Sequence, residues 1–182
     1  MKGQILKGPR ITLRPIKLAD APNCVRWFGD PEVAQYVSPA VYKIGLKKER
    51  EYLKNIIKSQ KDITYSIMAE DGKHIGSAGL HLDKKSIQNA GFGIVIGDKS
   101  YWGKGYAGEC IKLLGNLAFR KFKINRWSLT VFKENKRAIK AYKEAGFKTE
   151  GLLRQVVKSR VDGKFHDEYV MSILKEEWMK KK

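Results

Sequence analysis

The sequence predicts an α/β fold in which helices flank a mixed β-sheet. Short segments of alternating or β-branched residues recur along the chain, and helical patterns separate several of them. Two strand pairs are joined by Asp71-Gly72, a strong tight-turn signal, and by Asp162-Gly163. Hairpins pair strands antiparallel, whereas a helix between two strands indicates a crossover, so we expect both kinds of pairing in one sheet.

The N-terminal half is predicted to contain three strands and three helices. Residues 10–16 alternate apolar and polar side chains and stop at Pro15, which suits a first strand. Residues 64–69 and 74–82 flank the Asp71-Gly72 turn as the next two strands. Helical patterns lie at residues 20–29, at residues 31–39 as a short helix with a loop, and at residues 45–59.

The second half is organised around residues 90–122. Ile94, Val95 and Ile96 form a β-branched run bounded by glycine on both sides, which follows a polar loop at residues 83–89 and reads as a buried strand. A glycine-rich loop comes next, and from Ala107 the pattern is helical. The remaining elements are strands at residues 126–132, 148–157 and 165–174, a helix at residues 135–145 before Gly146, and a short basic helix at the C-terminal end.

Bulk properties limit the class of protein. The 182 residues suffice for one core, and we expect residues 1–182 to form a single domain. Cys24 and Cys110 lie in helical patterns, away from metal or disulfide spacing, which favours a reduced cytoplasmic protein. No signal core or membrane-length stretch is present in the sequence, so we expect no membrane association.

The formal net charge of +18 is the unusual bulk property. A basic surface favours anionic partners such as cofactor phosphates, acidic peptides, nucleic acid or anionic lipid. It disfavours a strongly cationic small substrate, unless acidic residues gather locally. A solvated lysine-rich surface with no binding role is the simpler alternative.

The glycine-rich loop has the chemistry of an anion site. Gly103 and Gly105 let a ligand approach the backbone on either side of Lys104, and the first amides of the following helix have no partner inside that helix. The helix dipole also favours negative charge, so a diphosphate would fit. No Gly-Lys-Ser/Thr ends the loop and the three-glycine dinucleotide fingerprint is absent, which leaves an ordinary glycine turn as the alternative.

A second constellation lies in the helix at residues 135–145. Tyr142 follows Asn135 by seven residues, about two helical turns, so both side chains project to a similar side. The phenol could hydrogen-bond a sulfur or oxygen atom of a ligand, and Asn135 could hold an amide group. A core or rim aromatic is the alternative for Tyr142.

Together the two constellations resemble the GNAT superfamily of N-acetyltransferases, with the RimJ/RimL-like and spermidine acetyltransferase branches closest in appearance. The likeness runs from RITLRPI at residues 10–16 to DGKFHDEYVMSIL at residues 162–174. It implies a mostly antiparallel sheet that splays at the cofactor site, early helices beside the substrate opening, and acetyl-CoA as donor with no metal. The acetyl group would pass to a primary amine by direct attack, without a covalent enzyme intermediate.

The resemblance also assigns residues. The backbone of Ile94, Val95 and Ile96 would pair with the pantetheine amides, and loop amides from Trp102 to Ala107 would wrap the diphosphate. Asn135 would bind pantetheine, and Tyr142 would donate a proton to the departing thiolate. The implied cofactor-binding set is Ile94, Val95, Ile96, Trp102, Gly103, Lys104, Gly105, Tyr106, Ala107, Asn135, Ala138, Tyr142 and Lys143.

Two positions depart from the family pattern. Trp102 stands where the family often has Gln or Arg, which a loop acting through its backbone tolerates. Gly91 stands where relatives of this branch frequently carry a glutamate beside the active centre, so the usual base is missing. His81, Asp83 and Glu109 are the candidate substitutes. Their structural alternatives are surface positions at a strand end for the first two and a favourable helix N-terminus for Glu109.

The acceptor is left open by the sequence. A protein N-terminus and a small-molecule amine both fit, and the basic surface favours an N-terminus or an anionic metabolite over a polyamine. A different class of function is a nucleic-acid or ribosome-associated binding module on the same scaffold with a vestigial pocket. An antibiotic or sugar-amine acetyltransferase and a homodimeric assembly are further possibilities.

Overall fold

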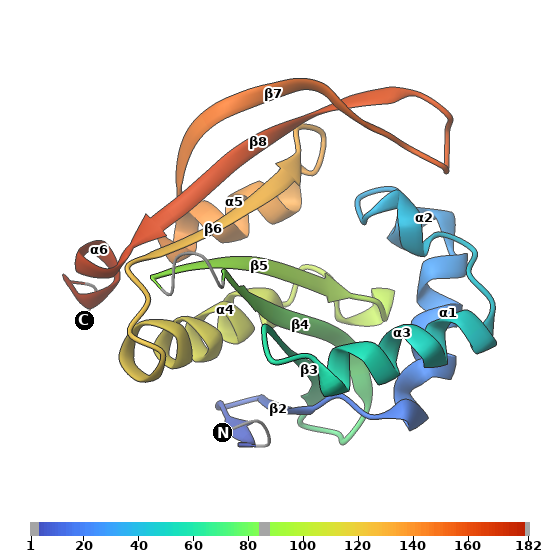
Figure 1. The fold of residues 1–182 in the computed structure, drawn as a ribbon, viewed down its shortest axis with the longest axis horizontal. Helices are drawn as coiled ribbons and strands as arrows, with labels where there is room; N and C mark the ends of the chain where they lie inside the picture. Colours follow the sequence, from blue (N-terminus) through green and yellow to red (C-terminus); the bar gives the residue numbers. More distant parts are fainter. Residues whose placement is uncertain (1–3, 84–87, 181–182) are drawn as a thin grey trace.

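The computed structural model describes residues 4–83 and 88–180, and within them eight strands form one sheet. The strand order is β1-β2-β3-β4-β5-β6-β8-β7, and every neighbouring pair is antiparallel except β5 and β6. The predicted mixed, mostly antiparallel sheet is therefore confirmed (Figure 1). The strands are β1 (Leu6–Lys7), β2 (Ile11–Pro15), β3 (Asp62–Ala69), β4 (His74–Leu82), β5 (Asn89–Ile96), β6 (Arg126–Phe132), β7 (Lys148–Lys158) and β8 (Phe165–Leu174).

The α-helices lie close to the predicted positions. They are α1 (Ala21–Gly29), α2 (Pro31–Ala34), α3 (Leu46–Lys58), α4 (Tyr106–Asn116), α5 (Lys136–Ala145) and α6 (Lys175–Lys180). Gly146 ends α5 in the left-handed conformation, with φ of 99°. The elements that were not predicted include β1, three short 3-10 turns and a π-helical turn over Leu117–Lys121 that prolongs α4. The predicted loop at residues 83–89 lies mostly outside the described residues.

The single parallel pairing, between β5 and β6, is short. Its register joins Asn89 to Arg126, Ala90 to Trp127 and Gly91 to Ser128, and no pair follows. Beyond Gly91, β5 remains paired with β4, whereas β6 continues beside β8. The two strands therefore diverge in the middle of the sheet, which is the splay that the family resemblance implied (Figure 1).

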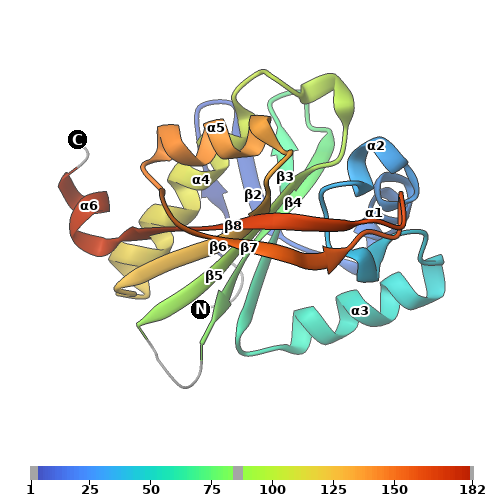
Figure 2. The same cartoon turned by 90° about the horizontal axis from the view of Figure 1, so that it is seen from above.

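The main core packs helices α4 and α5 against one face of the sheet (Figure 2). Phe92 and Trp127, from the diverging strands, have ring centroids 4.7 Å apart and are joined by Phe147 after α5. Each fully buried large apolar side chain contributes roughly 1.5–3 kcal/mol, so this cluster fixes α5 beside the divergence. A smaller cluster of Ile16, Ala21, Leu53 and Ile56 packs α1 and α3 near the N-terminal strands.

A buried polar network secures the start of α1. The Asp20 carboxylate accepts hydrogen bonds from the Arg14 guanidinium at 2.6 and 2.8 Å and from the Ser66 hydroxyl at 2.7 Å. Burial alone would raise the pKa of Asp20, but these hydrogen bonds and one from the Lys17 amide lower it to about 2. Within the described residues, no helix combines the length and apolarity that crossing a bilayer requires.

Candidate functional site

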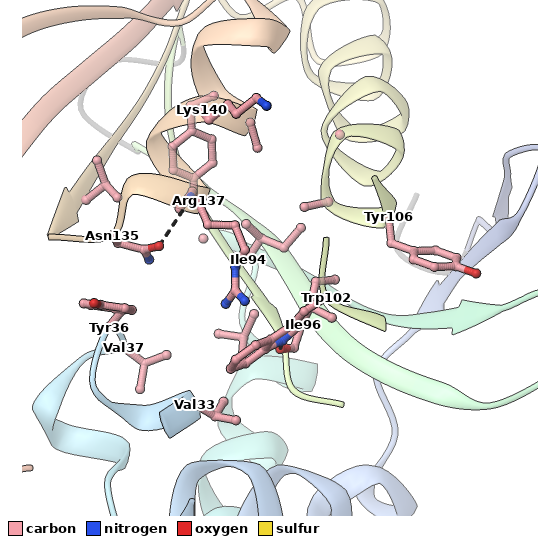
Figure 3. A pocket seen from close by; sticks show the side chains of 18 of the residues that line it. Val33, Tyr36, Val37, Ile94, Ile96, Trp102, Tyr106, Asn135, Arg137 and Lys140 are labelled. Atoms are coloured by element: carbon pink, nitrogen blue, oxygen red, sulfur yellow. Dashed lines mark hydrogen bonds between the residues drawn. The ribbon is translucent and has the colours of Figure 1, made fainter. Parts of the chain in front are cut away.

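A cavity of about 590 Å³ opens where β5 and β6 diverge (Figure 3). The C-terminal half of β5, the loop before α4, one side of α5 and the short helix α2 form its walls. The predicted residues that line it are Ile94, Val95, Ile96, Trp102, Gly103, Gly105, Tyr106, Ala107, Asn135, Ala138 and Tyr142. Lys104 and Lys143 do not line it; the Lys104 ammonium instead lies 5.8 Å from the Tyr101 ring centroid.

The glycine loop adopts a backbone that requires glycine at two positions. Gly103 and Gly105 have φ of 73° and 84°, in the left-handed region that other residues rarely adopt. Gly105 is also the N-cap of α4, so the free amides of that helix's first turn begin directly after it. The loop therefore presents backbone donors to the cavity, as an anion site needs.

Contacts outside the cavity hold this loop in place. The Arg10 guanidinium donates to the Lys104 carbonyl at 3.0 Å, and the Tyr106 hydroxyl donates to Glu70 at 2.8 Å. The Tyr106 side chain consequently points away from the cavity (Figure 3). The loop offers its backbone to a ligand while these side chains serve as anchors.

Trp102 contributes more than its backbone. Its indole Nε1 donates to the Ile96 carbonyl at 2.7 Å, which fixes the ring against the end of β5. The Arg137 guanidinium from α5 stacks on that ring, 3.7 Å from its centroid, and projects into the cavity (Figure 3). Desolvation lowers the pKa of Arg137, and no hydrogen bond from this guanidinium is found among the described residues. A cation held by stacking on Trp102 therefore lines the cavity.

Asn135 and Tyr142 lie on the cavity side of α5. Asn135 is the helix N-cap, and its side-chain oxygen accepts from the Ala138 amide at 3.1 Å, so its NH₂ group is left for other partners. Tyr142 is only 7% exposed, and no hydrogen bond of its hydroxyl is found in the described part of the chain. Burial raises the pKa of Tyr142, so the phenol stays protonated at neutral pH and can donate.

The three candidate bases lie in different surroundings. Glu109 accepts from the Arg10 amide at 2.8 Å and pairs with its guanidinium at 3.2 Å, outside the cavity lining. Asp83 is exposed just after the end of β4. His81 lies in β4 directly opposite Gly91, and its Nδ1 is 2.7 Å from the Asp62 carboxylate.

Sequence reasoning did not identify the wall opposite α5. This wall is built by Val33, Tyr36 and Val37, and the Tyr36 ring lies 5.9 Å from that of Phe132 on β6. The resemblance placed early helices beside the opening, yet no motif marked these side chains. Arg137 was also missed, although a cation two residues after the helix-capping Asn135 could have suggested it.

The arrangement suits group transfer from an extended anionic ligand. Backbone amides, a protonated phenol and an apolar wall all line this one cavity. Among residues 4–83 and 88–180, no group of three or more His, Cys, Asp or Glu side chains could hold a metal ion.

Comparisons with known proteins agree with this chemistry. The family model for the acetyltransferase (GNAT) domain matches residues 10–148. A Bacillus licheniformis protein described as the uncharacterized N-acetyltransferase p20 is 30% identical, over 96% of this chain and 98% of its own. The probable N-acetyltransferase YjcK of Bacillus subtilis is 26% identical, over 93% and 97% of the two chains. The structure of Vibrio cholerae spermidine N-acetyltransferase with CoA and spermine superposes with a TM-score of 0.83 at 22% identity, over 94% and 99%.

Proposed function

Because the chain belongs to the GNAT family of acetyltransferases, we propose that it transfers the acetyl group of acetyl-CoA to a primary amine. The observation that carries this proposal is the shared cavity of the α4 N-terminus and the Tyr142 hydroxyl. A nucleotide-bearing thioester needs an anion site and, some distance away, a proton donor for its sulfur. Both groups open into one cavity here.

In this proposal the cofactor lies along the open edge of β5. Beyond Gly91 that edge has no strand partner, so the backbone of Ile94 to Ile96 can pair with the amides of a pantetheine arm. The diphosphate would lie at the amides that follow Gly103 and Gly105, and the Asn135 NH₂ group would hold the arm from the α5 side. Arg137, which sequence reasoning did not include, would add positive charge between these positions.

The side chains then have simple roles. Bound acetyl-CoA would supply an activated acetyl group as a thioester. Tyr142 would donate its hydroxyl proton to the departing sulfur, because its raised pKa keeps the donor protonated. The ring that carries this hydroxyl is held by packing against Phe92 and Phe147.

The lining of the far wall supports an acceptor amine with apolar neighbours. Val33, Tyr36 and Val37 supply apolar or aromatic surface there. Glu32, the carboxylate of this wall, is already paired with Lys99 at 2.8 Å. A polycation would find little negative charge at this end, so we propose a peptide N-terminus or a small amine with an apolar side chain.

Thermal unfolding with acetyl-CoA tests the cofactor site. Ligand at 100 times its dissociation constant stabilises by about 2.7 kcal/mol, which for a chain of this length corresponds to roughly 5–10 °C in Tm. Gly105→Glu should abolish the rise, because a side chain at a φ of 84° strains the loop that presents the amides, and its Cβ would contact the Arg10 guanidinium that anchors this loop. Gly163→Glu is the matched control, since Gly163 has a similar φ of 73° in the distant β7–β8 turn.

The outcome separates enzyme from binding module. A Tm rise in the wild type and in Gly163→Glu, but not in Gly105→Glu, supports the proposal. No rise in the wild type, combined with steeply salt-dependent binding of RNA, would favour a nucleic-acid module instead. A panel of peptide N-termini, small amines and polyamines, assayed by release of free thiol, then identifies the acceptor.

A further inference from the structure

We propose that His81, oriented by Asp62, is the base that removes a proton from the acceptor amine. This inference rests on the proposed acetyl transfer and adds to it the group that makes the amine nucleophilic. An aliphatic amine is protonated at neutral pH and has no lone pair for attack, so its proton must first leave.

Strand register places Asp62, His81 and Gly91 side by side. On three neighbouring strands Asp62 pairs with His81, and His81 pairs with Gly91. Directly opposed residues of antiparallel strands point to the same face, so the carboxylate, the imidazole and the missing side chain form one row. This face is opposite to that of Phe92, which packs against Trp127 in the core under α4 and α5.

The His81 imidazole does not itself line the cavity, but it lies beside Gly93, which does. A methyl group added at Gly91 would lie 3.9 Å from the His81 Cδ2 atom, and one added at Gly93 would lie 4.0 Å from Nε2. The ring therefore extends along β5 with Nε2 leading toward Gly93, and Gly93 lines the cavity. No side chain at Gly93 intervenes between this nitrogen and the diverging strands.

The hydrogen bond to Asp62 selects the tautomer of the neutral imidazole that a base needs. An ionised carboxylate only accepts, so in the 2.7 Å contact Nδ1 donates, and in the neutral ring the lone pair lies on Nε2, the nitrogen on the Gly93 side. Asp62 is itself fixed by the Ser59 hydroxyl, which donates to it at 2.5 Å. Tyr52 of α3 is a further titratable group near this pair, since burial raises its pKa and the charge of Asp62 adds to this rise.

Several other titratable side chains are already held by neighbours. Glu109 is held by Arg10, and Glu32 is paired with Lys99. His74 is enclosed beside Asn23. The His81 side chain remains 50% exposed, so it can both meet the acceptor and return the proton to water.

In the proposed reaction the His81 Nε2 atom takes one proton from the ammonium group of the acceptor, which leaves a neutral amine and an imidazolium that releases the proton to solvent. The amine lone pair forms a C–N bond with the thioester carbonyl carbon as the C–S bond breaks, and its electron pair leaves on sulfur. Sulfur takes the Tyr142 proton, and the nitrogen loses its second proton, which restores the phenol through solvent.

A matched pair of small amines tests this role. Ethylamine and methoxyamine have the same shape, but at pH 7 ethylamine is protonated and methoxyamine is neutral. His81→Gln should lower turnover of ethylamine about 100-fold and leave methoxyamine within about threefold, because only ethylamine needs the base. Asp62→Asn should lower ethylamine turnover by a smaller factor. His166→Gln, which removes another histidine–aspartate pair, is the control and should change neither rate.

Equal losses with both amines, or no loss with either, would overturn the assignment. A second test of the role of His81 needs no acceptor amine. Addition of acetyl-CoA should shift the imidazole NMR signal of His81, identified by its absence in His81→Gln. A Tm rise with acetyl-CoA but no shift of that signal refutes the role of His81 alone. If the cofactor gives no Tm rise, the proposed acetyl transfer fails and the role of His81 fails with it.

Discussion

The Tyr142→Phe variant tests whether the Tyr142 hydroxyl acts in catalysis or the residue only packs in the core. The ring packs edge-on against Phe92, with centroids 6.1 Å apart, and also contacts Phe147, so Tyr142→Phe retains the aromatic contacts. The hydroxyl has no hydrogen-bond partner among the described residues. Its deletion therefore removes a donor directed at the ligand and little else.

For Tyr142→Phe the expected loss of turnover is much larger than the expected loss of stability. A positioned general acid contributes about 10²–10⁴-fold, and a 100-fold loss of turnover corresponds to about 2.7 kcal/mol of transition-state stabilisation. No intramolecular hydrogen bond, worth about 1 kcal/mol, is broken, so Tm should move by less than about 3 °C. We expect kcat to fall about 100-fold with little change in the affinity for acetyl-CoA.

The assay is thiol release under saturating acetyl-CoA, with thermal unfolding in parallel. Tyr65→Phe is the matched control, because Tyr65 is a phenol of β3 that is 2% exposed in the main core and lies outside the cavity. Unchanged turnover in Tyr142→Phe would show that the tyrosine is a packing residue. A large drop in Tm would equally refute the reasoning from its missing hydrogen bond.

Two further predictions concern stability and pH. The folded-state pKa of Asp20, about 2, lies below its unfolded value, so its stabilisation is complete above about pH 4 and is lost as pH falls toward 2. Asp20→Asn should lower the free energy of unfolding by about 2 kcal/mol at pH 7. In urea titrations it should also weaken the decrease of this free energy between about pH 4 and pH 2, and an unchanged decrease would contradict the prediction. Glu49 is 1% exposed, its Oε2 has no hydrogen-bond partner among the described residues, and burial raises its pKa. The free-energy penalty of ionising Glu49 in the folded state therefore grows as pH rises above its unfolded pKa. Glu49→Gln should raise Tm at pH 8 and have less effect near pH 4, and a lower Tm at pH 8 would count against it.

Local patterns were enough to predict most of the fold. Strand β6 has the predicted bounds, Arg126–Phe132, because its alternation of apolar and polar residues reflects one buried face. The Asp71-Gly72 turn forms with φ of 79° at Gly72, as a tight hairpin requires. The glycine loop could also be predicted, because glycine is the residue type that most readily adopts the left-handed φ angles found at Gly103 and Gly105.

Long-range geometry was not available from the same patterns. Nothing in the sequence of β5 indicates that its parallel pairing with β6 ends at Gly91. The cavity depends on this end, because the two strands diverge beyond it. Trp102 was interpreted through its backbone alone. Its indole donates a hydrogen bond to the end of β5, and the Arg137 guanidinium stacks on it. This stacking joins a loop and a helix that become neighbours only when the chain folds.

The position of the proposed base depends on the same kind of information. A slip of one residue between β4 and β5 would turn His81 to the core face, so its access to Gly93 is a property of register. Packing does not demand glycine at position 91, because an added methyl group would meet the His81 Cβ at an ordinary 3.5 Å. Glycine at this position leaves His81 and Asp62 as the titratable cross-strand pair beside the open edge of β5, which is why the proton is assigned to them.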